Sequence, residues 1–490
     1  MLFSSYEFIL VFLPLTLIGF FLVAKKSRKA AQAFLLLASF LFYAWWSFEY
    51  GLLIIATIVV NYAFGLKIQG IAQRDRRAAK PWLTTAIATN LALLGYYKYR
   101  DFFIENWNAV AGSDWDFAPL VLPLAISFHT FQQIAYLVDS YRCRVAQPSL
   151  TRYALFVLFF PQLIAGPIVH HYQLLPQLAA ARTYLYSHQS FAVGLSFFVF
   201  GLAKKLLIAD PLSGIADPIF DGALPEPPTF SQAWAGLLAY TLGLYFDFSG
   251  YSDMAVGLAR MFGIRLPYNF NSPYKATSII DFWHRWHMTL SQWLRDYLYI
   301  PLGGNRHGKV RRYVNLTLTM LLGGLWHGAA WSFVFWGLLH GLYLAINHAW
   351  HAVQARVTVR GRRLEIPLPM AWLLTFGAVA LAWVFFRSPT AAHAVAMTES
   401  LVGLHGWHSD RFAAALGPSQ AILIALAGAV ALLMPNSQEI IDGDGDQATS
   451  VSWLRLSWRP TLTWAAAVAG LLLLSLTQMS ARREFVYFQF

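Results

Sequence analysis

The chain is dominated by long apolar stretches, most of a length that suits a helix crossing the hydrocarbon core of a membrane. They run at about 6–24, 31–48, 50–66, 82–97, 119–138, 153–169, 190–208, 231–250, 313–327, 330–349, 368–386, 418–434 and 461–479. A helix needs about 20 residues to span a bilayer, and in lipid its backbone polar groups must bond to one another. Charged residues make up only 12% of the 490 residues, against roughly 25% in soluble proteins. The sequence therefore predicts an all-α, polytopic membrane protein with one membrane domain over residues 1–490.

The formal net charge of +12 indicates contact with lipid headgroups and not with nucleic acid. The basic residues lie mostly in short loops between apolar stretches, where they set orientation and contact anionic lipids. No basic face with interleaved aromatic residues is evident, which argues against nucleic-acid binding. Cys143 is the only cysteine, so an intramolecular disulfide and a thiolate metal cluster are both excluded.

The charges of the connecting loops predict how the chain is oriented in the membrane. Residues 25–29, 67–81 and 139–152 are basic, whereas residues 104–118 and 209–230 carry acidic residues and no Lys or Arg. Basic loops stay in the cytoplasm. We therefore expect a multi-pass membrane protein with an extracytoplasmic N-terminus.

Two features do not fit a simple alternation of cytoplasmic and extracytoplasmic loops. Segment 153–169 contains Pro161 and Pro167 and must return to the side from which it started, so we expect it to be broken or re-entrant. Lys204 and Lys205 lie near the expected outer end of their helix. Either their side chains snorkel to the interface, or that helix is longer than its apolar stretch.

Residues 278–300 carry aromatic side chains at three- and four-residue spacings, which predicts an amphipathic helix at the cytoplasmic interface. His284 and His287 lie three apart on it, and Ser291 and Arg295 continue the line from His287. Such a line suits a charged substrate, but it also suits the mixed polar face of an interfacial helix. A metal shared by the two histidines is less favoured, because no acidic third ligand is near.

His327 lies in the middle of an expected hairpin. Residues 313–349 are apolar and lie between the basic stretches 306–312 and 356–363, so this segment leaves the cytoplasm and returns. The turn places His327 within the membrane or near its outer side, among glycines and alanines. An intramembrane imidazole is a natural general base, although a buried histidine bonded to a carbonyl is the plainer alternative.

Other polar residues have structural interpretations. We expect Asp247 to form an internal ion pair at a helix end, and Asp139 to pair with Arg142. His340 falls on a different face from His327 if the helix is continuous, so a structural or interfacial role is expected. The same role is expected for His170 and His171.

Two motifs, residues 273–306 (PYKATSIIDFWHRWHMTLSQWLRDYLYIPLGGNR) and 321–331 (LLGGLWHGAAW), resemble the membrane-bound O-acyltransferase family. The similarity is greatest to the bacterial branch that contains the alginate O-acetylation membrane subunit. Further matching segments are 123–142, 159–169, 246–263, 383–390 and 434–440.

The resemblance implies a bundle of roughly a dozen helices with re-entrant segments around a tunnel, with core motifs over 123–349. The intramembrane histidine of the family falls on His327, and its second histidine falls on His287. The family is thought to take an acyl group from a cytoplasmic acyl-CoA-type donor. In this branch the group passes to an extracytoplasmic polysaccharide, directly or through a periplasmic acyltransferase partner.

The hypothesis that follows is acetyl transfer with His327 as the general base and His287 orienting the donor or polarising its carbonyl. Acetyl-CoA is a substrate in this scheme, and we expect no bound cofactor and no metal. Its phosphates suit the basic loop 303–312. The substrate-binding candidates are Ser291, Arg295, Trp286, Trp326, Asn305 and Lys309.

Several alternatives stay open. A transporter or flippase of an acyl or glycan intermediate would share the helices, and a membrane scaffold would need neither histidine. Acylation of teichoic acid, lipid or protein competes within the enzyme class. His129, His170 and His284 depart from the pattern of the branch, which is consistent with a subfamily acting on cellulose or another exopolysaccharide.

Overall fold

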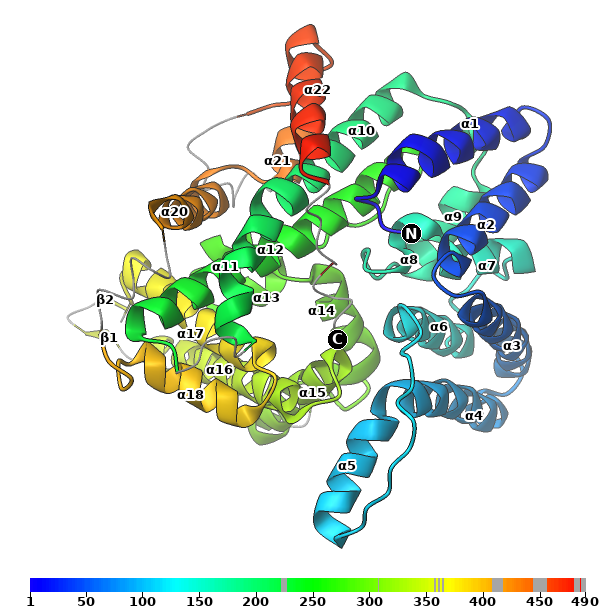
Figure 1. The fold of residues 1–490 in the computed structure, drawn as a ribbon. Coiled ribbons are helices and arrows are strands. Elements are labelled where there is room, and N and C mark those ends of the chain that lie inside the picture. Colours follow the sequence, from blue (N-terminus) through cyan, green and yellow to red (C-terminus); the bar gives the residue numbers. More distant parts are fainter. Residues whose placement is uncertain are drawn as a thin grey trace. The chain divides into compact units, whose positions relative to one another are not determined.

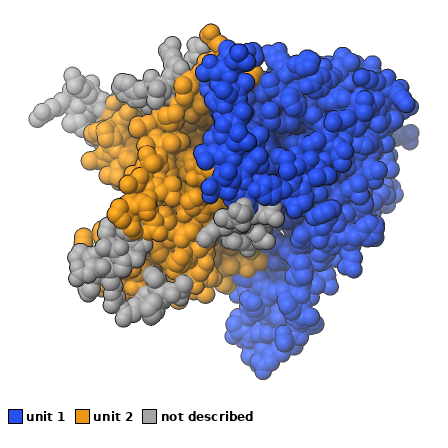
Figure 2. All heavy atoms as spheres, turned by 45° about the horizontal axis from the view of Figure 1, so that its top comes forward, with its two compact units in different colours: residues 1–202, 251–268, 460–481 blue, residues 203–250, 269–459, 482–490 orange. Residues whose placement is uncertain are grey.

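The computed structural model describes residues 1–221, 227–306, 308–356, 358–359, 362–363, 365–407, 417–443, 456–479 and 485. Nearly all regular structure in them is helical, which confirms the all-α prediction. The chain forms two compact units (Figure 2), each built from separate stretches of sequence. Unit 1 comprises residues 1–202, 251–268 and 460–481, and unit 2 comprises residues 203–250, 269–459 and 482–490. One membrane domain over residues 1–490 stays a prediction.

Unit 1 contains the N-terminal helices drawn from blue to cyan in Figure 1. Its elements are η1 (Glu7–Phe12), α1 (Leu13–Ala24), α2 (Arg28–Ala44), α3 (Phe48–Ala72), α4 (Arg76–Leu94), η2 (Gly95–Tyr99), α5 (Arg100–Ala111), α6 (Ile126–Tyr141), α7 (Leu150–Leu158), α8 (Phe160–Leu163), α9 (His171–Ala179), η3 (Ala181–Tyr184), α10 (His188–Ala203) and α22 (Leu462–Thr477). The second half of α12 (Phe230–Met261) also belongs to this unit.

Unit 2 contains the elements that carry both motif histidines. They are η4 (Lys204–Ala209), α11 (Asp210–Phe220), the first half of α12, η5 (Pro273–Lys275), α13 (Ile279–Arg285), α14 (Met288–Leu294), η6 (Arg295–Tyr299), α15 (Gly308–His327), α16 (Trp331–Gln354), β1 (Thr358–Val359), β2 (Arg362–Arg363), α17 (Leu368–Arg387), α18 (Ala391–Leu401), α20 (Pro418–Leu433) and α21 (Ser437–Ile441). The two short strands pair antiparallel as a small hairpin.

Among the residues that the structure describes, four helical segments are long and apolar enough to cross a membrane: Glu7–Ala24, Phe48–Ala72, His188–Phe220 and Leu368–Arg387. Helices α20 and α22 are apolar but shorter. Such segments are stable in lipid because each satisfies its own backbone. With the family resemblance, they support a multi-pass membrane protein.

The break predicted within residues 153–169 is confirmed, and the return of this segment to the same side of the membrane stays a prediction. Helix α7 ends at Leu158, the single turn α8 ends at Leu163, and the chain then runs without regular helix to His170. This irregular backbone is buried in unit 1, where protein covers its polar groups.

The apolar stretch at 190–208 is shorter than the helix that contains it, because the helix continues through η4 and α11 to Phe220. Lys205 does not snorkel. It is buried and forms ion pairs with Asp210 (2.8 Å) and Asp247 (2.7 Å). We call these three residues the lysine–aspartate triad. The pairing expected for Asp247 is thus present, and Lys205 provides the positive charge.

Helices α15 and α16 form the expected hairpin and lie side by side in unit 2 (Figure 1). Glycines permit their close approach. A Cβ on Gly324 would collide with the carbonyl oxygen of Phe333, and one on Gly341 would lie 2.9 Å from the Cα of Thr317. Small residues at helix contacts are the usual means of tight packing in membranes.

Candidate functional site

The helix expected over residues 278–300 is broken, so that prediction is wrong in an important detail. Helix α13 ends at Arg285 and α14 begins at Met288, and between them His287 has a left-handed backbone (φ 42°). Backbone bonds fix this bend, because the amide of Met288 donates to the carbonyl of Asn269 (2.9 Å). A left-handed conformation at a non-glycine residue is strained and persists only when its surroundings hold it.

The break separates the two histidines that the sequence placed on one helical face. His284 is exposed, whereas His287 is completely buried. The aromatic side chains of this region pack on protein, since Trp283 contacts Trp336 and Trp286 contacts Trp383. The two histidines therefore cannot act as one line of ligands.

His287 is oriented by Asn269. The Oδ1 atom of Asn269 accepts a hydrogen bond from the hydroxyl of Thr289 (2.9 Å) and lies 3.1 Å from Nδ1 of His287. An amide oxygen can only accept hydrogen bonds, so the imidazole must be the donor. Nδ1 of His287 therefore carries the proton, and Nε2 carries the lone pair. Burial lowers the pKa of His287, which favours this neutral form.

His327 is the last residue of α15 and is almost fully buried. Its ring is surrounded by aromatic rings, with Trp336 at 5.2 Å, Phe386 at 5.3 Å and Trp326 at 4.9 Å between centroids. All three meet it edge to face, the geometry that aromatic quadrupoles favour. These walls exclude water and hold the imidazole in place.

The structure brings the two motif histidines together. Their ring centroids are 6.5 Å apart, and the ring of Trp326 lies 6.4 Å from that of His287. An oxygen atom hydrogen-bonded to both rings at about 2.8 Å would give a separation of this order. The pair is therefore spaced to hold one small polar group between two imidazoles in an apolar setting.

The other predicted substrate contacts divide into residues near the histidine pair and residues distant from it. Trp286 is buried next to His287, and its carbonyl accepts a bond from the Ser291 hydroxyl (3.5 Å). Arg295 is exposed and paired with the adjacent Asp296 (2.7 Å), so it does not reach the histidines.

Asn305 and Lys309 are exposed at the other end of α15 from His327. At a rise of about 1.5 Å per residue, Lys309 lies about 27 Å from His327 along the helix axis. The basic loop is therefore remote from the paired imidazoles, and any single substrate that contacts both must be long.

Sequence reasoning missed three residues that build the site: Asn269, Trp336 and Phe386. Phe386 lay within a quoted motif, but nothing local indicated that its ring would face His327. His340 was assigned to a continuous helix with His327, which is wrong because α15 ends before α16 begins. Its Nδ1 accepts a bond from the indole of Trp283 (3.3 Å), and its ring packs on Trp336.

Asp139 does pair with Arg142 (3.3 Å), and it also contacts Nε2 of His171 (3.1 Å) in the interior of unit 1. This arrangement fits the structural role expected for His171. In the part of the chain that the structure describes, no group of three or more His, Cys, Asp or Glu side chains could hold a metal ion.

Comparison with known proteins gives consistent matches along the chain. The model of the membrane-bound O-acyltransferase family matches residues 40–386. A peptidoglycan O-acetyltransferase of Helicobacter pylori is 44% identical over 83% of this chain and 80% of its own length. A probable alginate O-acetylase of Pseudomonas aeruginosa is 44% identical over 83% of this chain and 76% of its own. A teichoic acid D-alanyltransferase of Streptococcus thermophilus is 29% identical over 54% of this chain and 68% of its own.

Proposed function

Because the chain belongs to the membrane-bound O-acyltransferase family and is an acyltransferase, we propose that it transfers acetyl groups from cytoplasmic acetyl-CoA for O-acetylation of a cell-surface polysaccharide. Relatives named for peptidoglycan and for alginate support a polysaccharide acceptor. The acceptor is an alginate-like exopolysaccharide or cellulose, reached directly or through a periplasmic acyltransferase. The protein then works in the inner membrane with its N-terminus outside.

The observation that carries this proposal is the buried pair of His327 and His287, with ring centroids 6.5 Å apart. Acyl transfer to a hydroxyl needs a base within hydrogen-bonding reach of the proton that leaves. In the proposed step His327 removes the hydroxyl proton as the oxygen attacks the thioester carbonyl. The C–S bond then breaks, and the CoA thiolate leaves and takes up a proton.

His287 has a positioning role in this scheme. With its Nδ1 proton directed at Asn269, its Nε2 accepts a hydrogen bond and therefore orients a hydroxyl group. Polarising the carbonyl would require the protonated imidazole, which burial disfavours. Polarisation of the donor carbonyl is therefore disfavoured, and the orientation proposed here is that of the acceptor hydroxyl and not of the donor.

The length of α15 supports a long donor. Lys309 lies near its start and His327 at its end, about 27 Å apart along the axis. A CoA thioester carries its phosphates and its acyl group at opposite ends of an extended arm. The phosphates would bind the basic end, as carboxylates and phosphates do at Arg and Lys, and the acetyl group would reach the histidines.

The test is an assay of purified protein with radiolabelled acetyl-CoA, with and without oligosaccharide acceptors, following CoA release and acetyl transfer. The matched variants are His327→Ala and His284→Ala, which remove a buried and an exposed histidine. We expect release in the wild type and in His284→Ala only. Acceptor-dependent turnover that survives His327→Ala would refute the assignment of the base.

The relative named for teichoic acid D-alanylation favours one alternative, in which the group transferred is not acetyl. Competition between acetyl-CoA and other activated acyl donors separates the two. If no donor is consumed with any acceptor present, a transporter of an acyl or glycan intermediate replaces the transferase.

A further inference from the structure

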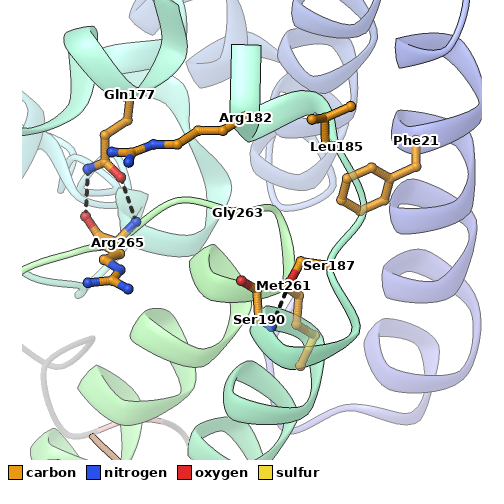
Figure 3. A pocket seen from close by; sticks show the side chains of 9 residues that line it. All are labelled: Phe21, Gln177, Arg182, Leu185, Ser187, Ser190, Met261, Gly263 and Arg265. Atoms are coloured by element: carbon orange, nitrogen blue, oxygen red, sulfur yellow. Dashed lines mark hydrogen bonds between the residues drawn. The ribbon is translucent and has the colours of Figure 1, made fainter. Parts of the chain in front are cut away.

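A cavity of about 320 Å³ lies within unit 1, and none of its nine lining residues is among those assigned to acyl transfer (Figure 3). Its wall is formed by the last turn of α1, the connection from η3 to α10, and the turn that follows α12. None of these segments contributes to the histidine pair, so the cavity needs a separate explanation.

The cavity has a fixed frame. The side chain of Gln177 donates to the carbonyl of Arg265 and accepts from its amide, both at 2.8 Å. Gly263 has a left-handed backbone (φ 73°), and a Cβ there would lie 3.3 Å from the carbonyl oxygen of Thr183. Thr183 in turn donates its hydroxyl to the carbonyl of Gln177 (2.6 Å). These bonds hold the two loops at a set separation.

The lining is positively charged. Arg182 and Arg265 contribute guanidinium groups, and none of the nine lining residues is acidic. Neither arginine forms an ion pair with a carboxylate in the part of the chain that the structure describes. Arginine forks match the oxygen atoms of phosphate, and an arginine pair with no acidic partner attracts anions.

Helix α10 adds to the positive electrostatic potential of the cavity. Ser187 precedes the helix, and its hydroxyl oxygen accepts a bond from the amide of Ser190 (3.2 Å). Both serines line the cavity, so hydroxyl groups and the positive end of a 16-residue helix face its interior.

One side of the cavity is apolar. Phe21 and Leu185 lie across from the arginines in Figure 3, and Phe21 belongs to a helix long enough to cross the membrane. Lys25 and Lys26 follow in the next turn. A cationic recess beside the basic end of a spanning helix is at the depth where lipid headgroups lie.

We propose that this cavity binds the phosphate group of an anionic ligand, with Arg182 and Arg265 contacting its oxygens and Phe21 contacting its apolar part. A phospholipid headgroup with a net negative charge meets both requirements. A choline headgroup does not, because the lining offers no carboxylate to its ammonium. Free phosphate would meet only the polar half.

The test uses the full-length protein in detergent, titrated with a fluorescent phosphatidylglycerol and, separately, with the matching phosphatidylcholine. The test variant is Arg182→Gln/Arg265→Gln. The matched control is Arg74→Gln/Arg77→Gln, which removes two exposed arginines that do not line the cavity. We expect tighter binding of phosphatidylglycerol, weakened about 10- to 100-fold in the test variant and nearly unchanged in the control. Arg182→Lys/Arg265→Lys keeps the charge and should fall between them.

Competition with millimolar inorganic phosphate shows whether the phosphate group that binds belongs to a lipid headgroup or is free phosphate. Failure to displace the lipid supports a headgroup site, and displacement that depends on the same arginines supports free phosphate. Equal loss of binding in both double-glutamine variants would mean a general charge effect and overturn the site. So would wild-type affinity in a monodisperse Arg182→Gln/Arg265→Gln protein.

Discussion

Unit 2 contains two buried clusters of ionisable side chains. Burial of such groups is costly, and the two clusters differ in what surrounds and stabilises them. The lysine–aspartate triad places the ammonium group of Lys205 between two carboxylates, 2.8 Å from Asp210 and 2.7 Å from Asp247. The histidine pair places two rings 6.5 Å apart between aromatic walls, and burial lowers the pKa of His287. The first arrangement joins helices α11 and α12, and in the proposed mechanism the second presents nitrogen atoms to a reacting group.

The difference shows why burial alone does not identify a catalytic residue. Ionisable groups inside a membrane protein are costly and are often functional. In the triad, however, a substrate would have to displace an ion pair to reach any member. The imidazole of His287 commits one nitrogen to Asn269 and can exchange protons at the other without breaking that contact.

The largest expected effect is on transfer. His327→Ala should lower acetyl transfer by about 1,000-fold, the range of a lost general base, with a melting temperature close to that of the wild type. Turnover and thermal stability of the detergent-purified variant check this. A normal rate would remove His327 from the mechanism.

The triad should show the reverse pattern. Lys205→Met leaves two buried carboxylates without their cation and should destabilise the fold by about 3–5 kcal/mol, so monodisperse protein is lost on heating. Lys205→Met/Asp210→Asn/Asp247→Asn removes all three charges and should recover much of the thermal stability. If Lys205→Met keeps full stability but loses activity, the contrast between the clusters fails.

A smaller effect is expected at the support of His287. Asn269→Ala removes the oxygen that fixes the imidazole and should lower transfer by about 10-fold to 100-fold with moderate loss of stability. Asn269→Asp retains an acceptor and should keep more activity than Asn269→Ala. Equal rates in the two variants would show that orientation of His287 is unimportant.

The smallest effect is expected at His284, which is exposed and separated from His287 by the break in the helix. His284→Ala should change both transfer and melting temperature by less than the spread between preparations, since surface substitutions usually cost under about 0.5 kcal/mol. A large loss of activity would return His284 to the site and restore the predicted line of ligands.

The sequence predicted the features that arise from local patterns. Apolar length located the helices, and basic flanks around a glycine-rich turn predicted the hairpin with His327 at its end. These signals are local because a helix in lipid must satisfy its own backbone. The break between α7 and α8 was equally visible, since Pro161, which lies in the first turn of α8, lacks an amide proton.

Features that depend on distant contacts could not be predicted. The aromatic spacing continues through residues 279–297, so the pattern alone favours an unbroken helix. The break at His287 is imposed by backbone bonds to the segment around Asn269. Likewise Lys205 and Asp247 are 42 positions apart, and only the packing of α12 on η4 makes them partners.

The glycine contacts of the α15–α16 hairpin fix the position of α15 against α16, so the distance between the two ends of α15 is also fixed. Because Gly324 and Gly341 bring the two backbones together, α15 cannot slide or rotate to absorb a change in its length. One inserted residue would turn His327 by about 100° and move it by about 1.5 Å. Insertions in α15 should therefore abolish the site even where helix and composition are preserved, whereas the exposed turn before it should accept them. Under the proposed mechanism, the spacing from the basic end of α15 to His327 therefore sets a fixed length for the donor.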